Sequence, residues 1–125
     1  MDRIIHATRL AGTDTVRLTV WEPSAYTGPH ATVGTLGLGR GCYGRLDSRR
    51  SAEVDAMVPG SPERRAAAKA HSVRLAEESV ALIHATLGRV GKVVAPWNGE
   101  VHTTADELDA FGWASLLDAP VEVPA

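Results

Sequence analysis

The stretch SPERRAAAKAHSVRLAEESVALIHATLG, residues 61–88, carries the signals of a long helix at both of its ends. Ser61 can cap the helix, Pro62 takes the first helical position, where no amide hydrogen is needed, and Glu63 suits the positive end of the helix dipole. Gly88 stands where a left-handed residue terminates a helix. These signals predict a helix over residues 62–87.

This helix carries two lines of apolar residues. A continuous stripe with alternating spacings of three and four contains Val73, Ala76, Val80, Ile83 and Leu87. A shorter line, well round the cylinder, contains Ala68, Leu75 and Leu82. Two lines predict a helix covered on two sides, by its own sheet and by either the C-terminal helix or a second subunit. Leu75 and Leu82 are therefore candidate subunit-interface residues.

Strand and turn signals lie on both sides of the helix. The segments of residues 3–10 and 15–22 flank AGTD, and Val16, Leu18 and Val20 alternate with polar residues, which predicts an opening hairpin. After the helix, residues 92–104 read as a second hairpin in which Asn98-Gly99 supplies the two positive φ angles of a tight turn.

The C-terminal region begins with a capping-box pattern. Thr104 and Glu107 have the spacing of this motif, so a short helix is expected from about residue 105 to residue 117. It would present Leu108, Phe111 and Trp113. Residues 118–125 form an extended tail, which would fray unless its own sheet or a neighbouring chain holds it.

Together these elements predict a single α+β domain over residues 1–125. Its antiparallel sheet would combine the N-terminal hairpin with a glycine-rich strand, and one long helix would pack on it. A hairpin and a short C-terminal helix would follow. A chain of 125 residues has room for one modest core and no second one.

The glycine-rich strand is expected within ATVGTLGLGRGCYGRLDSRR, residues 31–50. In a strand, Gly37, Gly39 and Gly41 would share one bare face that a close neighbour can approach, so they are candidate interface residues. The alternative is a flexible glycine loop. Residues 39–44 also fit GxGxxG, but no amphipathic helix follows them, and no cofactor is predicted.

Basic residues cluster between residues 40 and 69. If the chain folds back on the helix start, they would form a patch that contacts nucleic acid or another anion. These candidates are Arg40, Arg45, Arg49, Arg50, Arg64, Arg65 and Lys69. The alternative is a solvated rim in which acidic neighbours pair with the arginines; these neighbours are Asp47, Glu53, Asp55 and Glu63.

Catalytic and metal-binding patterns are weak. The five histidines are scattered, none at helical i, i+4 spacing, and Cys42 is the single cysteine, so neither a metal site nor a catalytic residue is predicted. The chain has no signal-peptide pattern and no membrane-spanning apolar run, which predicts a cytoplasmic protein without membrane contact.

The net charge of −2 conceals a polarity along the chain. Residues 1–92 hold all thirteen basic groups against nine acidic ones, whereas residues 93–125 hold six acidic groups and no basic one. Such opposite ends would suit head-to-tail contact. We expect a small non-enzymatic binding or assembly module, working as a homo-oligomer or with a protein partner. The alternatives are a nucleic-acid-binding module and a small enzyme centred on Cys42 or a histidine.

Overall fold

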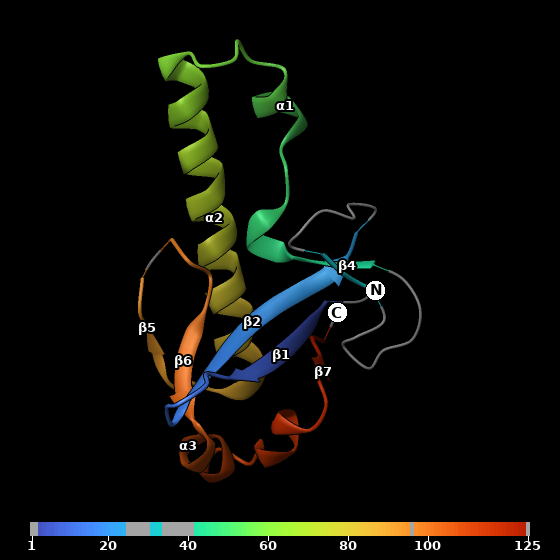
Figure 1. Cartoon of the computed structure of the whole chain (residues 1–125), viewed down its shortest axis with the longest axis vertical. Helices are drawn as coiled ribbons and strands as arrows, with labels where there is room; N and C mark the ends of the chain where they lie inside the picture. The colour runs from blue at the N-terminus through green and yellow to red at the C-terminus, as the bar shows by residue number, and fades with distance from the viewer. Residues whose placement is uncertain (1–2, 25–30, 34–41, 96, 125) are drawn as a thin grey trace.

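The computed structural model describes residues 3–24, 31–33, 42–95 and 97–124. In this part of the chain one antiparallel sheet has a long helix, α2 (Pro62–Leu87), packed on it (Figure 1), and the predicted α+β class is confirmed. The strands are β1 (Ile4–Arg9), β2 (Thr15–Pro23), β3 (Ala31–Val33), β4 (Cys42–Arg45), β5 (Lys92–Val93), β6 (Val101–Thr104) and β7 (Val121–Glu122). The shorter helical elements are η1 (Leu46–Ser48), α1 (Ala52–Asp55), α3 (Ala105–Ala110) and η2 (Ala114–Leu117).

Strand β2 is the centre of the sheet. The expected hairpin with β1 forms, and its register places Arg9 opposite Val16 and Ile4 opposite Trp21. On its other side β2 changes partner midway, because residues 15–18 pair with β6 and residues 21–23 pair with β4. The path β3-β4-β2-β1-β7 and the branch β2-β6-β5 therefore share one strand.

Helix α2 has the bounds that its end signals predict. The Ser61 hydroxyl accepts a hydrogen bond of 3.1 Å from the Arg64 amide, and Pro62 follows the cap. Gly88 ends the helix with a φ of 94°, in the region that favours glycine. Local chemistry thus sets both ends.

The core lies between the sheet and the C-terminal half of α2. Val16, Leu18 and Val20 of β2 face Ile83 and Leu87, and all five are buried. Leu108 of α3 and Leu116 of η2 belong to the same cluster, so the C-terminal region contributes to this core. Burial of each large side chain contributes about 1.5–3 kcal/mol to the stability.

The second apolar line of the helix is used within the chain. Leu75 is only 5 % exposed and belongs to the core, and the partly buried Leu82 packs against it. Both residues therefore pack within the chain, where η1 and β2 are the elements that contact α2 most extensively, and their role at a subunit interface stays a prediction.

The second hairpin forms, but its predicted tight turn is wrong. Lys92 pairs with His102 and Val93 with Val101, so the connection between the two strands is longer than a two-residue turn. Gly99 has a φ of 64°, whereas no described residue other than glycine has a positive φ, which excludes the expected turn at Asn98. Contacts from a distant part of the chain, described below, set the shape of this loop instead.

The C-terminal helix is shorter than predicted. Helix α3 ends at Ala110, Gly112 follows with a φ of 83°, and the chain re-forms a single 3₁₀ turn as η2. The Thr104 hydroxyl caps the Glu107 amide at 3.1 Å as expected. The Glu107 carboxylate accepts hydrogen bonds from the Gly91 amide and the Thr103 hydroxyl, and so ties α3 to the chain after α2.

The C-terminal tail is held by its own sheet. Strand β7 pairs with β1, with Val121 opposite Ile5, and the Val123 amide donates to the Arg3 carbonyl at 2.8 Å. Val121 and Val123 also pack against the core. Of the helices in the described ranges, none combines the length and apolarity that crossing a bilayer requires.

Candidate interaction surface

Residues 49–74, here called the arm, stand apart from the core. They comprise α1, the turn after it and the first half of α2, and extend away from the sheet (Figure 1). None of these residues is buried, and Val58 is 71 % exposed. An isolated helix of this length is marginally stable in water. The first half of the longest helix therefore contributes no buried side chain, whereas all five buried residues of the helix lie in its second half.

Polar contacts close the arm on itself. Arg50 binds both carboxylate oxygens of Asp55 at 3.1 Å, and this pairing lowers the pKa of Asp55. The Arg64 guanidinium donates to the Met57 carbonyl at 3.0 Å, and that of Arg65 donates to the Gly60 carbonyl at 2.8 Å. These three predicted anion contacts therefore have partners in the arm.

The base of the arm is fastened to the sheet by Arg49. Its guanidinium binds the Glu22 carboxylate on β2, with one contact of 2.8 Å, and the hydrogen bond raises the pKa of Arg49. The His71 ring nitrogen meets the Arg49 carbonyl at 2.7 Å, which joins the base of the arm to α2. Glu22 was not among the acidic neighbours expected from the sequence.

The remaining predicted site residues fall into two groups. Lys69 is exposed on α2. Gly37, Gly39, Gly41 and Arg40 lie outside the described residues, so the glycine strand and the contact assigned to Arg40 stay predictions.

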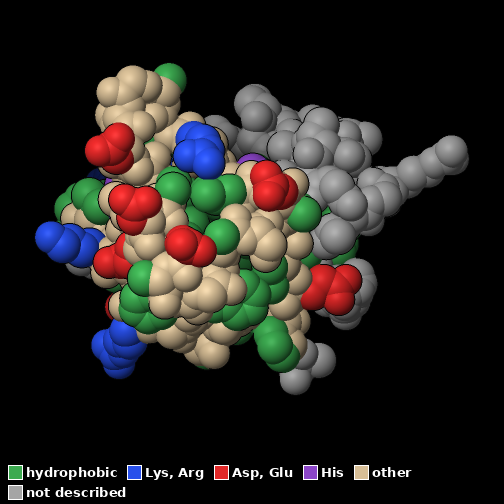
Figure 2. Space-filling model, turned by 90° about the horizontal axis from the view of Figure 1, so that it is seen from below, with side chains coloured by type: hydrophobic (Ala, Val, Ile, Leu, Met, Phe, Trp, Pro, Cys, Tyr) green, Lys and Arg blue, Asp and Glu red, His purple; other side chains and the backbone are tan. Residues whose placement is uncertain are grey.

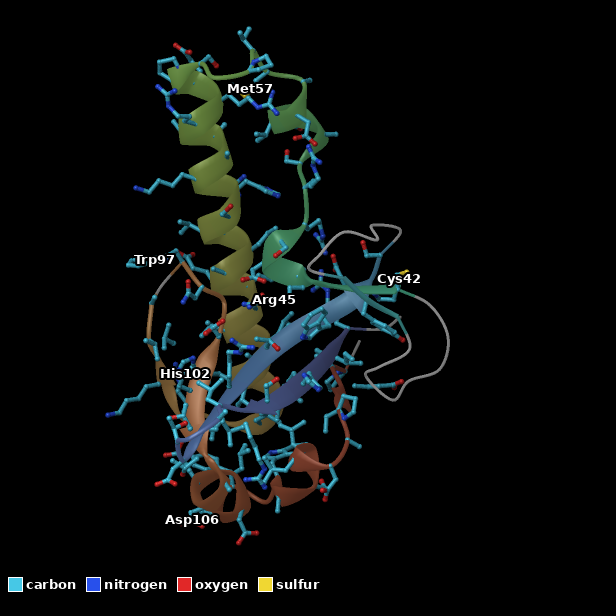
Figure 3. The ribbon with its side chains drawn as sticks, viewed as in Figure 1. Cys42, Arg45, Met57, Trp97, His102 and Asp106 are labelled. Atoms are coloured by element: carbon cyan, nitrogen blue, oxygen red, sulfur yellow. The ribbon has the colours of Figure 1, made fainter. Side chains whose placement is uncertain are left out.

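Arg45 joins three segments of the chain into a clamp (Figure 3). Its guanidinium binds Asp47 in η1 through two contacts of 3.0 and 2.8 Å. It also donates to the Asn98 carbonyl at 2.7 Å and to Glu100 at 3.2 Å. Gly99 lies so close to Asp47 that an added Cβ would meet the Asp47 side chain at 3.0 Å. This clamp fixes the loop of residues 94–100 against η1.

Glu100 extends the clamp to β6. The His102 ring nitrogen donates to the Glu100 carboxylate at 2.9 Å. Burial tends to raise the pKa of Glu100, but the hydrogen bond from His102 and the charges of Arg45 and Arg17 outweigh it and hold this pKa below its usual value. For Asp47 burial prevails over the opposing effect of Arg45, and its pKa is raised. Both carboxylates depend on Arg45 for compensation.

The clamped loop presents an apolar surface beside α2, here called the Trp97 patch. Trp97 is 67 % exposed and Val94 61 % exposed, and Figure 3 shows the Trp97 side chain pointing away from the ribbon. The patch consists of Val80, Ala81, Val93, Val94 and Trp97. A shallow groove of about 230 Å³ runs into it between α2 and β5, lined by Glu77, Val80, Ala81 and Val93.

Sequence reasoning missed this patch. The segment VVAPWNGE was interpreted only as hairpin and turn, and Trp97 received no role. A tryptophan directly before the turn-forming Asn98-Gly99 is the signal that could have indicated an exposed contact. The clamp gave no local signal, since Arg45 lies far along the chain from Asn98 and Glu100.

The α3 end of the molecule is more acidic than basic, as Figure 2 shows from below. Two hollows lie beside the start of α3, with volumes of about 290 and 260 Å³. Both are lined in part by Thr15 and Thr104. In the described ranges no three histidine, cysteine or acidic side chains gather as metal ligands would.

The residues proposed for an enzymatic centre are dispersed. Cys42 is a free, half-buried thiol on β4, and it lies across the sheet from His102 (Figure 3). His102 is bound to Glu100, and His71 contacts the Arg49 carbonyl. The described side chains do not place Cys42 beside either of these two histidines.

No family model matches the chain, and comparison with curated proteins and with solved structures finds no match either. The functional argument therefore rests on the arm and the Trp97 patch.

Proposed function

We propose that this protein is a non-enzymatic assembly module that works as a homo-oligomer. The observation that carries the proposal is the arm: residues 49–74 include half of the longest helix and no buried side chain. A partner that packs on the arm would supply the cover that this half of α2 lacks within the chain.

The energetics of the arm support this proposal. Exposed ion pairs such as Arg50–Asp55 are screened by water, so they stabilise the arm only weakly. Apolar burial is the larger source of stability for an amphipathic helix. Binding of a partner would provide that burial.

The Trp97 patch supplies the second support. Tryptophan is enriched among the residues that dominate binding energy at interfaces, especially when it is preorganised on a rigid element. Trp97 belongs to a loop that Arg45 fixes through Asn98 and Glu100. Its apolar surface is thus held in place before any partner binds, which lowers the entropic cost of association.

The proposal is tested by measuring the solution mass of the whole chain with light scattering on a sizing column. The protein is examined from micromolar to near-millimolar concentration, at low and at high salt, with absorbance recorded at 260 and 280 nm. We expect a defined oligomer whose absorbance is that of protein alone.

A monomer at every concentration would overturn the assembly proposal. A monomer that carries absorbance at 260 nm, which high salt removes, would overturn it in favour of nucleic-acid binding through the arm arginines. In that case the double variant R64E/R65E should lose the bound nucleic acid.

A further inference from the structure

The outer face of α2 carries a ridge of six exposed residues. Their spacing of four, four, three, four and four keeps them on one side of the helix, opposite the side that Leu75, Ile83 and Leu87 bury. The ridge consists of Ala66, Ala70, Arg74, Glu77, Ala81 and Ala85. Its C-terminal half runs along the groove that leads to the Trp97 patch, because Glu77 and Ala81 line both.

The ridge is self-complementary under reversal of direction. A two-fold axis that crosses the helix at right angles between residues 75 and 76 places Ala66 opposite Ala85 of the second copy. It likewise places Ala70 opposite Ala81 and Arg74 opposite Glu77. Alanine side chains allow two helices to approach closely, and the arginine and the glutamate would meet twice, once on each side of the axis. Neither Arg74 nor Glu77 forms an ion pair with another described residue of its own chain.

We propose that the ridge is the two-fold interface of a homodimer, in which two α2 helices pack antiparallel. This inference rests on the proposed function, since it names a second copy of the chain as the partner. The reciprocal charges of Arg74 and Glu77 identify that occupant, because a surface complementary to itself fits another copy.

The same antiparallel arrangement would cover both the arm and the Trp97 patch. In an antiparallel pair the arm of one copy lies beside the C-terminal half of the other copy's α2. That half adjoins the groove and the Trp97 patch. Each Trp97 would then pack on the alanine-rich turns of the partner's arm, and each arm would gain the apolar cover that its own chain does not give it.

Charge reversal on the ridge tests the pairing. The variant R74E would put four carboxylates at the axis, and E77R would put four guanidinium groups there, so each single variant should dimerise at least about tenfold more weakly than the wild type. The double variant R74E/E77R restores both reciprocal pairs and should dimerise within about threefold of the wild type. An equimolar mixture of the two single variants should form heterodimers.

The control is R9E, which makes the same charge change at an exposed position at the end of β1, outside α2. It should dimerise like the wild type, and circular dichroism should show unchanged helix content in every variant. Dimer dissociation is followed by sedimentation equilibrium.

The outcomes separate this inference from the proposed function. If the wild type assembles but the double variant and the mixture stay as weak as the single variants, the two-fold pairing is overturned and the assembly proposal stands. A mass that grows without limit as concentration rises would indicate head-to-tail contact. That result too would overturn the two-fold pairing and leave the assembly proposal standing. A monomeric wild type would overturn both.

Discussion

Arg45 holds the Trp97 patch in place although Arg45 is not part of that patch. It lies at the end of β4, yet its guanidinium reaches η1 and the loop of residues 94–100. The side chains of Arg45, Asp47 and Glu100 are 21, 13 and 11 % exposed, so three charges share a largely desolvated space. Loss of one charge from such a group leaves the others uncompensated.

The variant R45M is therefore expected to lose about 3 kcal/mol of unfolding free energy, because Asp47 and Glu100 would remain buried without their cation. R45K keeps the charge but not the planar fork that binds Asp47 through two contacts, and should lose less. Urea denaturation of both variants measures these losses. Equal stability of R45M and the wild type would show that the clamp contributes nothing.

His6 gives the fold a dependence on pH. Burial lowers the pKa of His6, and the nearby charge of Arg17 acts in the same direction. The unfolded chain then binds a proton more readily than the folded chain once the pH falls below the ordinary histidine value of 6.5. The contribution of His6 to stability is complete above that value and is lost as the pH falls through the lowered pKa.

We expect the unfolding free energy of the wild type to decrease from pH 7.5 toward pH 5, and that of H6Q to decrease less steeply. Denaturation curves recorded at each pH provide the comparison, and the difference between the two proteins at pH 7.5 is the reference. Parallel curves for the two proteins would contradict this account.

At the scale of elements, the sequence predicted those helix ends that residues close in the chain determine. Ser61, Pro62 and Gly88 act within one turn of the helix ends, and the sequence predicted both ends of α2. The turn at Asn98-Gly99 was mispredicted because Arg45 and Asp47 shape it from a distance. The interruption of the last helix at Gly112 was missed, since Leu116 of η2 reaches the core only after that bend.

The candidate site was less predictable than the fold. The arginines from residue 45 to residue 65 were recognised as a basic cluster, and Asp47 and Asp55 were among the acidic partners expected for them. Pairing with Glu22 or with a backbone carbonyl depends on tertiary structure and was not predicted. The ridge on α2 is present in the sequence as a pattern of exposed spacing. The ridge can be identified as an exposed face only when the buried side of the helix is known.

The two halves of α2 should differ in local stability. In dilute monomer, amide hydrogens of residues 66–74 should exchange at least about a hundredfold faster than those of residues 79–87, because no buried contact holds the arm. Assembly should slow exchange in the arm selectively. Hydrogen exchange followed by mass spectrometry measures both effects, and uniform protection of α2 in the monomer would contradict the first.

At the scale of the whole molecule, the basic and acidic residues gather at opposite ends of its long axis. The arm, with six basic and three acidic residues, extends from one end of the sheet, and the acidic α3 end lies at the other (Figure 1). Among the described residues, the basic segment 40–69 forms one ion pair with the acidic segment 100–122, between Arg45 and Glu100. Most of this polarity therefore remains on the surface, where it can orient a partner.

The central place of β2 in the sheet also affects when the Trp97 patch forms during folding. Thr15 pairs with Thr104, so this part of the sheet closes only after nearly the whole chain has been brought together. Such distant pairings form slowly, whereas α2 depends on local contacts. The hairpin that carries Trp97 is joined to the sheet through these pairings. A chain that has not finished folding would expose its arm without a fixed Trp97 patch, so correct assembly would select for completely folded copies.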